Sequence, residues 1–408
     1  MINTILDQSI ICPYCRSPLS DDNNKLTCTK CNRVYPIKNG IIDFRKIDDY
    51  WCNVSRDKMR GLNCLAQETG DWLNSAKKII PEYVDHFTPF YRADSQFLWP
   101  ANKESRILDA GCMWGGISIP AAQFHSQVYA VDKTFETLEF LKIRAEQMGV
   151  DNIYTFAAPV KALPFADNFF DLVVLNGVLE WVALEDDVVL EQDYKGKRKN
   201  SQIYSKSPGQ MQSDVLKELH RVLKPKGCLY IAIENRYGVQ YFLTYPDNHN
   251  NVRFTSVLPR FMANTLSRIV GKGQYRTYTY SPRQLVNLLR ESNFEAESIY
   301  GVFPHYIKTQ KAFPLSLAGV FKNQIQIEGM LPKLMLKIIK PIIPKFIAKY
   351  ISPSLFVISR KSNNHSKVLC RMRDLLIKAN IIKDDSHIDL IISNNRYENC
   401  NSTNIIVY

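Results

Sequence analysis

Four of the ten cysteines stand in two closely spaced pairs near the N-terminus. Cys12 and Cys15 form one CxxC pair, Cys28 and Cys31 form the second, and a turn-rich stretch separates them. Each pair can place two thiolates on one side of a tight turn, so two pairs together supply the tetrahedral sulfur cage that zinc prefers. The spacing predicts one structural zinc, with no open coordination position, in a ribbon-like module over residues 8–46. The alternative is four free cysteines whose spacing is a coincidence.

A second candidate site follows a short apolar strand in the middle of the chain. The strand Arg106–Ala110 carries Asp109 and leads into the turn Gly111–Gly115, and the next strand ends at Asp132. Glycine lets the backbone approach a ligand closely, and an acidic residue after the second strand can bond ribose hydroxyls. The two features together indicate a nucleotide-type site at the ends of these strands.

Strands and helices must alternate to position these residues. Downstream of Asp132 the chain carries a buried apolar strand ending at Asn176, a helix from about Ser213 and the strand Cys228–Ile233. This alternation predicts an open, mainly parallel α/β sheet. The last two strands are predicted over Phe294–Val302 and Leu355–Arg360. Residues 51–104 are predicted to form a helical lead-in, and residues 362–408 an appendage of unknown role.

The ordered motifs resemble those of class I S-adenosylmethionine-dependent methyltransferases, in particular a type 11-like domain. They are Leu108–Cys112, Val131-Asp132, Leu163–Phe165 with Phe170–Val173, and Arg221–Pro225. The resemblance implies a Rossmann-like seven-stranded methyltransferase sheet over residues 105–361. The ribbon in front of it resembles the small zinc modules that accompany some methyltransferases.

The same resemblance implies a donor site. Asp109 and the glycine turn would hold the methionine part of the donor, Asp132 the ribose hydroxyls, and Pro159 with Val160 the adenine. Met113 departs from the family, which usually has glycine there, and Pro159 stands where it often has aspartate. The predicted donor residues are Asp109, Gly111, Cys112, Gly115, Asp132, Lys133, Pro159, Val160 and Asn176.

Candidate acid–base residues follow the fourth and fifth strands. Glu180 lies just past the fourth strand, Glu234 ends the fifth, and Asp247 and His249 occupy the loop that follows. Reacting groups gather at the carboxyl ends of strands in such sheets, and a methyl acceptor often has a proton to lose. Glu180 or His249 is therefore the predicted base. The alternatives are a helix-start charge for Glu180 and a loop-stabilising role for His249.

Longer segments are similar to one bacterial group of methyltransferases associated with surface-polysaccharide assembly. They are Asn176–Trp181, Glu234–Gly238, Pro246–His249 and Tyr275–Ser281. This similarity implies a small-molecule or lipid-linked saccharide as acceptor. Two alternatives stay open: an rRNA or tRNA base methyltransferase, and a degenerate, non-catalytic scaffold that Met113 and Pro159 would explain.

The positive charge is concentrated late in the chain. The formal net charge is +12, and the segment from His305 to Lys361 has ten basic residues against Glu328, which accounts for +9. A uniformly basic nucleic-acid binder is therefore less well supported, and RNA is the less favoured partner. A basic insertion is expected at about residues 305–352.

Within this insertion, Leu331–Lys340 predicts a helix with Lys333, Lys337 and Lys340 on one face and apolar residues opposite. Such a helix can lie on an anionic membrane. The alternative is a lid whose apolar side packs on the core. The chain has no apolar run of about 18 residues and no secretory signal, so the expectation is a cytoplasmic protein, peripheral to the inner membrane face if the helix binds lipid.

Overall fold

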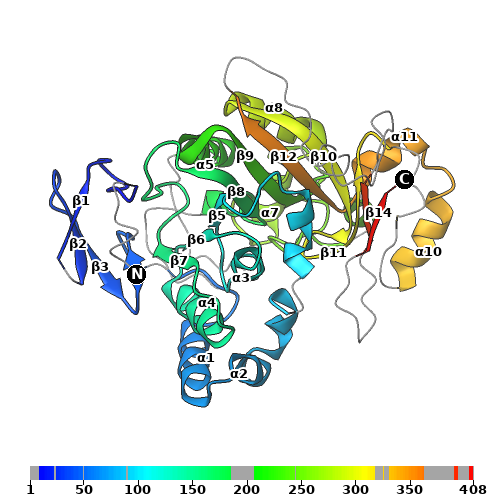
Figure 1. Ribbon diagram of the computed structural model, residues 1–408. Helices are drawn as coiled ribbons and strands as arrows, with labels where there is room; N and C mark the ends of the chain where they lie inside the picture. The colour runs from blue at the N-terminus through cyan, green and yellow to red at the C-terminus, as the bar shows by residue number, and fades with distance from the viewer. Residues whose placement is uncertain are drawn as a thin grey trace.

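One large mixed sheet organises the protein. The computed structural model describes residues 9–22, 24–48, 50–88, 91–184, 206–243, 245–317, 325, 330–362, 390–393 and 404–407. At the centre, β7 (Ile153–Ala157), β6 (Gln127–Asp132), β5 (Arg106–Ala110), β8 (Phe170–Asn176) and β9 (Leu223–Glu234) lie side by side in that order and run parallel. The predicted parallel α/β core is confirmed (Figure 1).

Two antiparallel pairings continue the sheet beyond β9. β12 (Ser354–Lys361) pairs antiparallel with β9, and β10 (Phe294–His305) pairs antiparallel with β12. These two strands match the last two that the sequence predicted, and with the five parallel strands they make the expected seven.

The sheet is nevertheless wider than seven strands, and in this respect the prediction was wrong. In the described part of the chain it contains 14 strands. One edge is extended by β11 (Lys308–Pro314), β13 (Leu390–Ser393) and β14 (Asn404–Val407), all antiparallel. Part of the basic insertion is thus sheet, because β11 folds back on β10 as a hairpin.

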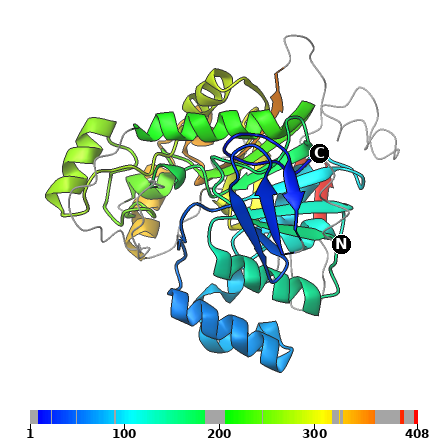
Figure 2. The same ribbon diagram turned by 90° about the vertical axis from the view of Figure 1, so that its left-hand side faces the viewer.

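The opposite edge is extended by the cysteine-rich module. Its strands are β1 (Leu19–Asp21), β2 (Lys25–Cys28), β3 (Val34–Lys38) and β4 (Ile41–Asp43), and β4 pairs parallel with β7. Ile42 and Phe44 belong to the same buried apolar cluster as Phe156 and Phe165 of the central domain. Figure 2 shows these strands (blue) in front of the sheet, with the first helices below. The module therefore shares a core with the sheet.

Helices cover the sheet and close its ends. The main ones are α3 (Ser118–Ala122), α4 (Phe135–Gln147), α5 (Pro208–Val222) and α8 (Pro282–Glu291). The sequence placed the start of α5 near Ser213, which was wrong by five residues. The helix begins earlier because Ser207 and Gln210 form a capping box, which satisfies the free N–H groups of the first turn.

The segment before the central domain is helical. It forms α1 (Arg56–Thr69), α2 (Trp72–Ile79) and the 3-10 helices η2 (Pro81–His86) and η3 (Tyr91–Leu98). Figure 1 places α1 and α2 beside α4, and Asn63 of α1 donates a hydrogen bond of 2.9 Å to the carbonyl of Glu136.

Further helices complete the described part of the chain. They are η4 (Val182–Leu184), α6 (Val239–Phe242), α7 (Arg260–Ile269), α10 (Met330–Ile339), α11 (Lys345–Ala348) and η5 (Lys349–Ile351). Among the described residues, no helix combines the length and apolar character needed to cross a bilayer.

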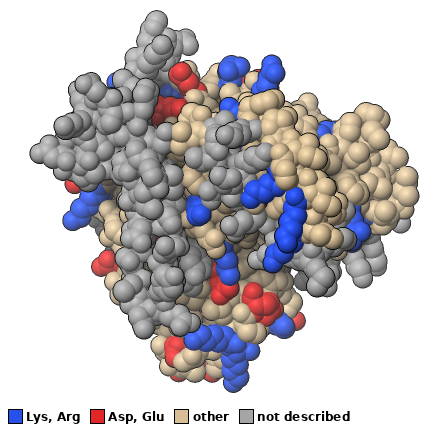
Figure 3. Space-filling view, turned by 90° about the vertical axis from the view of Figure 1, so that its right-hand side faces the viewer, with Lys and Arg blue, Asp and Glu red and all other residues tan. Residues whose placement is uncertain are grey.

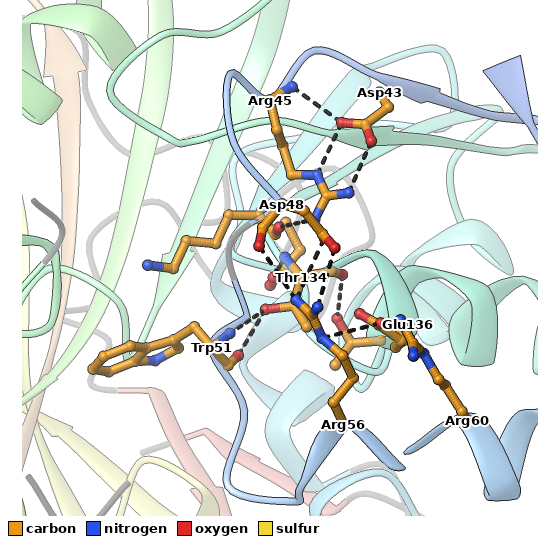
Figure 4. Close-up of polar contacts among 11 residues, drawn as sticks. Asp43, Arg45, Asp48, Trp51, Arg56, Arg60, Thr134 and Glu136 are labelled. Carbon is orange, nitrogen blue, oxygen red and sulfur yellow. Dashed lines mark hydrogen bonds and ion pairs between the residues drawn. The ribbon is translucent and has the colours of Figure 1, made fainter. Parts of the chain in front are cut away.

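Figure 4 shows a polar network that joins the linker after β4 to the start of α4. The Arg45 side chain, 8% exposed, forms two hydrogen bonds of 2.8 and 2.9 Å to Asp43 and a third to the carbonyl of Lys133. Arg56 contacts both Asp48 and Glu136. The network fixes the linker against the turn that follows β6.

The first prediction concerns Arg45. Replacing it by methionine leaves the Asp43 carboxylate, which is 12% exposed, without its cation. We expect Arg45→Met to lower the free energy of unfolding by about 3 kcal/mol, seen as a lower urea midpoint. Arg60 pairs with Glu136 but is 59% exposed, so Arg60→Met is the matched control and should cost less than about 1 kcal/mol. Equal midpoints for the two variants would contradict the assignment.

Candidate active site

A cavity opens where the order of the strands reverses. From β5 the chain moves outward to β6 and β7, and it then returns to the other side of β5 as β8. Ligands of open α/β sheets bind in the crevice at the carboxyl ends of the strands at this point. The cavity there measures about 340 Å³ with its open mouth, and its lining residues are His86, Arg92, Asp109, Gly111, Cys112, Met113, Trp114, Gly116, Ile117 and Asn176.

The turn after β5 needs glycine for two physical reasons. Gly111 has a φ of +80°, and a Cβ there would lie 2.5 Å from Val178. Met113 has a φ of 49°, in the region that favours the glycine usual in the family. Its side chain is partly buried against the apolar cluster of α1 and α2, so the fold accommodates this departure.

Polar groups inside the cavity suit a zwitterionic nucleoside ligand. Asp109 is buried and accepts a hydrogen bond of 2.6 Å from Ser118. Burial raises the pKa of Asp109 to about 7, although the Ser118 hydroxyl lowers it. Asn176 is also buried, and among the described residues neither its amide oxygen nor its amide nitrogen has a hydrogen-bond partner. Buried polar groups without partners in a cavity wall can bind the polar atoms of a methyl donor.

Two lining residues come from the helical lead-in and were not predicted. The Arg92 guanidinium lies 3.4 Å from Nδ1 of His86. Burial and the Arg92 cation lower the pKa of His86 to about 4, so this imidazole is neutral near pH 7. Arg92 is therefore the positive group of the cavity wall. No sequence motif links Arg92 to β5, so the sequence gave no indication that this side chain would line the cavity.

The predicted donor residues divide into two sets. Asp109, Gly111, Cys112 and Asn176 line the cavity. Asp132 lies beside it and accepts hydrogen bonds from the backbone N–H groups of Met113 (2.9 Å) and Thr134 (2.8 Å). The others outside the lining are Gly115, which completes the turn, Lys133, Pro159 and Val160.

A second polar site lies past the end of β8. Glu180, Glu234, Asp247 and His249 form what we call the buried acid–histidine cluster. His249 Nε2 lies 3.4 Å from a carboxylate oxygen of Glu234 and 4.0 Å from one of Glu180, and Nδ1 lies 2.8 Å from Asp247. Both predicted acid–base residues, Glu180 and His249, therefore come together in one place.

Burial and mutual charge set the protonation of this cluster. Burial and the neighbouring Glu234 charge raise the pKa of Glu180 to about 7. Burial lowers the pKa of His249, but the carboxylates of Glu234 and Asp247 outweigh it and hold that pKa well above its usual value. Burial raises the pKa of Glu234, but His249 outweighs this effect and the net shift is downward.

Aromatic and hydroxyl groups enclose the cluster. Tyr275 and Ser256 donate hydrogen bonds of 3.0 and 2.9 Å to Asp247, and the Trp181 ring lies 4.7 Å from the His249 ring. Tyr306 reaches Glu180 from β10–β11. The sequence gave no signal for Tyr306, which lies 126 residues from Glu180.

The four paired cysteines lie close together, as the spacing predicted. Their sulfur atoms are all within 4.8 Å of one another, with 3.7 Å between Cys12 and Cys31 and 3.3 Å between Cys15 and Cys28. Four sulfurs at about 2.3 Å from a zinc ion would be separated by about 3.8 Å. The arrangement fits a structural zinc.

Two family models match the chain. Residues 101–243 match a model described as Methyltransferase domain, and residues 10–40 match one described as Trm112p-like protein. These matches confirm the predicted methyltransferase domain and zinc ribbon, and with them S-adenosylmethionine and zinc as the cofactors of the two modules.

Similarity to curated proteins is confined to a short stretch. Uncharacterized protein Rv1405c of Mycobacterium tuberculosis and Uncharacterized protein Mb1440c of Mycobacterium bovis are each 42% identical over 69 residues, which is 17% of this chain and 25% of theirs. The chain thus spans about a quarter of the length of the curated relatives it matches.

Several solved structures resemble the fold at low identity. Geranyl diphosphate methyltransferase in complex with SAM has a TM-score of 0.39 and 13% identity over 72% of this chain and 91% of that one. The complex between the Haloferax volcanii Trm112 methyltransferase activator and the putative methyltransferase has a TM-score of 0.38 and 11% identity over 74% of this chain and 98% of that one.

The second prediction tests the donor site at Asp132. Replacing it by alanine removes the acceptor expected for the ribose and releases the N–H of Met113. Hydrogen bonds to a charged group contribute about 1.5–3 kcal/mol, so we expect affinity for S-adenosylmethionine to fall by about 10- to 150-fold in calorimetry. The exposed Asp151, replaced by alanine, is the control. Unchanged affinity in a folded Asp132→Ala protein would refute this site.

Proposed function

We propose that this protein transfers a methyl group from S-adenosylmethionine to a small-molecule or lipid-linked saccharide used in cell-surface polysaccharide synthesis. The observation that carries the proposal is the pairing of two sites at the end of β8. Asn176 lines the donor cavity, and Glu180, four residues further along the chain, belongs to the buried acid–histidine cluster. A donor site beside proton-handling groups is what methyl transfer to a protic acceptor requires.

The four segments with the finer family similarity support the same acceptor site. Glu180 comes from Asn176–Trp181 and Glu234 from Glu234–Gly238, while His249 and Tyr275 come from the remaining two. These residues are separated by up to 95 positions, yet all contact the same cluster. A shared site explains why the four segments occur together, and it favours an enzyme over a degenerate scaffold.

The bound donor supplies an electrophilic methyl on its sulfonium sulfur. Arg92 is placed to hold the donor's carboxylate, Asp132 to hold its ribose, and Asn176 to bond its polar groups. The glycine turn lets the donor lie against the backbone. The cluster assists removal of the acceptor's proton through Glu180, which His249 positions, and its enclosure by Trp181 and Tyr306 keeps water away.

The third prediction tests the cluster. We expect Glu180→Gln and His249→Ala each to lower kcat by about 10²- to 10⁴-fold while donor affinity stays within twofold, because proton transfer contributes in that range. The exposed Glu295, replaced by glutamine, is the control. Labelled donor would be incubated with the wild-type protein and either lipid-linked saccharide extract or total RNA. Label in RNA alone would reject the saccharide acceptor, and no transfer to either would favour the scaffold.

We further propose that the late basic segment rests on an anionic membrane. α10 buries Leu336 in the protein, but Leu334, Ile338, Ile342 and Phe346 are 57–75% exposed. The lid alternative, in which the apolar side packs on the core, accounts only for Leu336 and its neighbours. Figure 3 views the molecule from the right-hand side of Figure 1, and it shows basic side chains near the middle of that face, beside a broad area without charged side chains. Exposed apolar side chains beside lysines are typical of helices that bind anionic lipid.

The fourth prediction concerns Lys333 and Lys337, which are exposed on α10. Each lysine near an anionic surface contributes about 1 kcal/mol, so Lys333→Gln with Lys337→Gln should weaken binding to phosphatidylserine vesicles about 30-fold at low salt. Lys77→Gln with Lys78→Gln on α2 makes the same charge change elsewhere and should have no effect. Absence of vesicle binding by the wild-type protein at about 50 mM salt would end this proposal.

A further inference from the structure

The buried acid–histidine cluster has the composition and spacing of a metal site. One atom each from Glu180, Glu234 and His249 can be chosen so that all three lie within 4.8 Å of one another. The three residues come from three different segments, and their side chains are 0%, 9% and 0% exposed. Two carboxylates and one imidazole are ordinary ligands of divalent transition metals.

Three buried polar atoms of the cluster make no hydrogen bond within the described part of the chain: Nε2 of His249, Oε2 of Glu180 and Oε2 of Glu234. Nε2 and the Glu234 oxygen contact each other only as an ion pair. The 3.4 Å between Nε2 and the Glu234 oxygen is the separation expected for two ligands at about 2.1 Å from a tetrahedral ion. A buried polar atom without a partner is costly, and a cation would satisfy all three atoms at once.

The outer groups are arranged as they are around bound metals. A metal-ligating histidine usually donates its second N–H to a carboxylate, which fixes the ring and the tautomer. Asp247 takes this position, 2.8 Å from Nδ1 of His249. Tyr275 and Ser256 hold Asp247 in turn. Nε2 is thereby directed at the two glutamates.

The charge of the cluster also favours a cation. Glu180, Glu234 and Asp247 are three buried carboxylates, and in the described part of the chain their ion pairs are all with His249. Buried charges are retained when they are paired or coordinate a metal. A divalent ion would offset the negative charge that His249 leaves unbalanced.

We propose that Glu180, Glu234 and His249 bind a divalent transition-metal cation and that Asp247 positions His249 for this purpose. The inference rests on the proposed function and narrows it to an acceptor that reacts through oxygen. A coordinated hydroxyl would pass its proton to the carboxylate of Glu180, and its oxygen–methyl bond would form as the sulfur–methyl bond breaks, with that electron pair remaining on sulfur. Coordination would lower the pKa of the acceptor hydroxyl. Glu180, Glu234 and His249 would therefore promote its deprotonation by holding the ion.

Manganese(II) separates this site from the ribbon, because it prefers oxygen and nitrogen ligands over thiolates. Full-length protein with zinc in the ribbon would be titrated with Mn²⁺ alone, and the free ion followed by electron paramagnetic resonance. We expect one Mn²⁺ per chain. Glu234→Gln and His249→Ala should each weaken binding at least 100-fold, and Asp247→Asn by about 10- to 100-fold. Asp214→Asn, a partly exposed acid of α5, is the control.

Two results would overturn the metal proposal: no Mn²⁺ uptake by the folded wild-type protein, or uptake that the cluster variants leave unchanged. Asp247→Asn retains the shape of the side chain, so it tests the site even if His249→Ala does not fold. Full methyl transfer by chelator-treated protein that retains its ribbon zinc would reject the metal and leave the proposed function intact. Mn²⁺ bound at the cluster without methyl transfer to any acceptor would reject the proposed function alone.

Discussion

The carboxylate of Asp132 joins the segments that form the donor cavity. One oxygen accepts the N–H of Met113 in the glycine turn, and the other accepts the N–H of Thr134 at the start of α4. The Thr134 hydroxyl in turn exchanges hydrogen bonds with the backbone of Trp51. The hydrogen bonds of Asp132 and Thr134 thus hold together the glycine turn, the end of β6 and the linker from the ribbon. A shift of the linker would therefore also move the turn at the end of β5.

A buried cation also joins the glycine turn to the helical lead-in. Arg144 of α4 is fully buried, and it donates to the backbone carbonyls of Trp114 and Phe87. The ring of Trp72 lies 4.5 Å from its guanidinium. Burial lowers the pKa of Arg144 to about 9. Because these carbonyls belong to the glycine turn and the lead-in, Arg144 keeps the helices that carry His86 and Arg92 over the cavity.

The parts of the protein that the sequence predicted correctly depend on short spacings. Two CxxC pairs, a glycine turn after a strand, and apolar strands alternating with helices are local patterns, and they sufficed for the ribbon and the methyltransferase sheet. The pairing of β4 with β7 joins residues more than 100 positions apart, and Arg92 reaches the cavity through tertiary packing alone. Neither leaves a periodic signal. Glu180 and His249 could be placed together because both follow strand ends, whereas Tyr306 could not.

The end of β8 explains why the two sites are adjacent. Asn176 faces the donor cavity, and Gly177 follows with a φ of +65°. A Cβ at position 177 would overlap the Tyr306 hydroxyl, which reaches the Glu180 carboxylate. The sharp turn that only glycine permits therefore sends the chain from the wall of one site directly into the other. The spacing between the cavity and the buried acid–histidine cluster is set by four residues of backbone, which is a stiffer constraint than a loop contact between separate domains could supply.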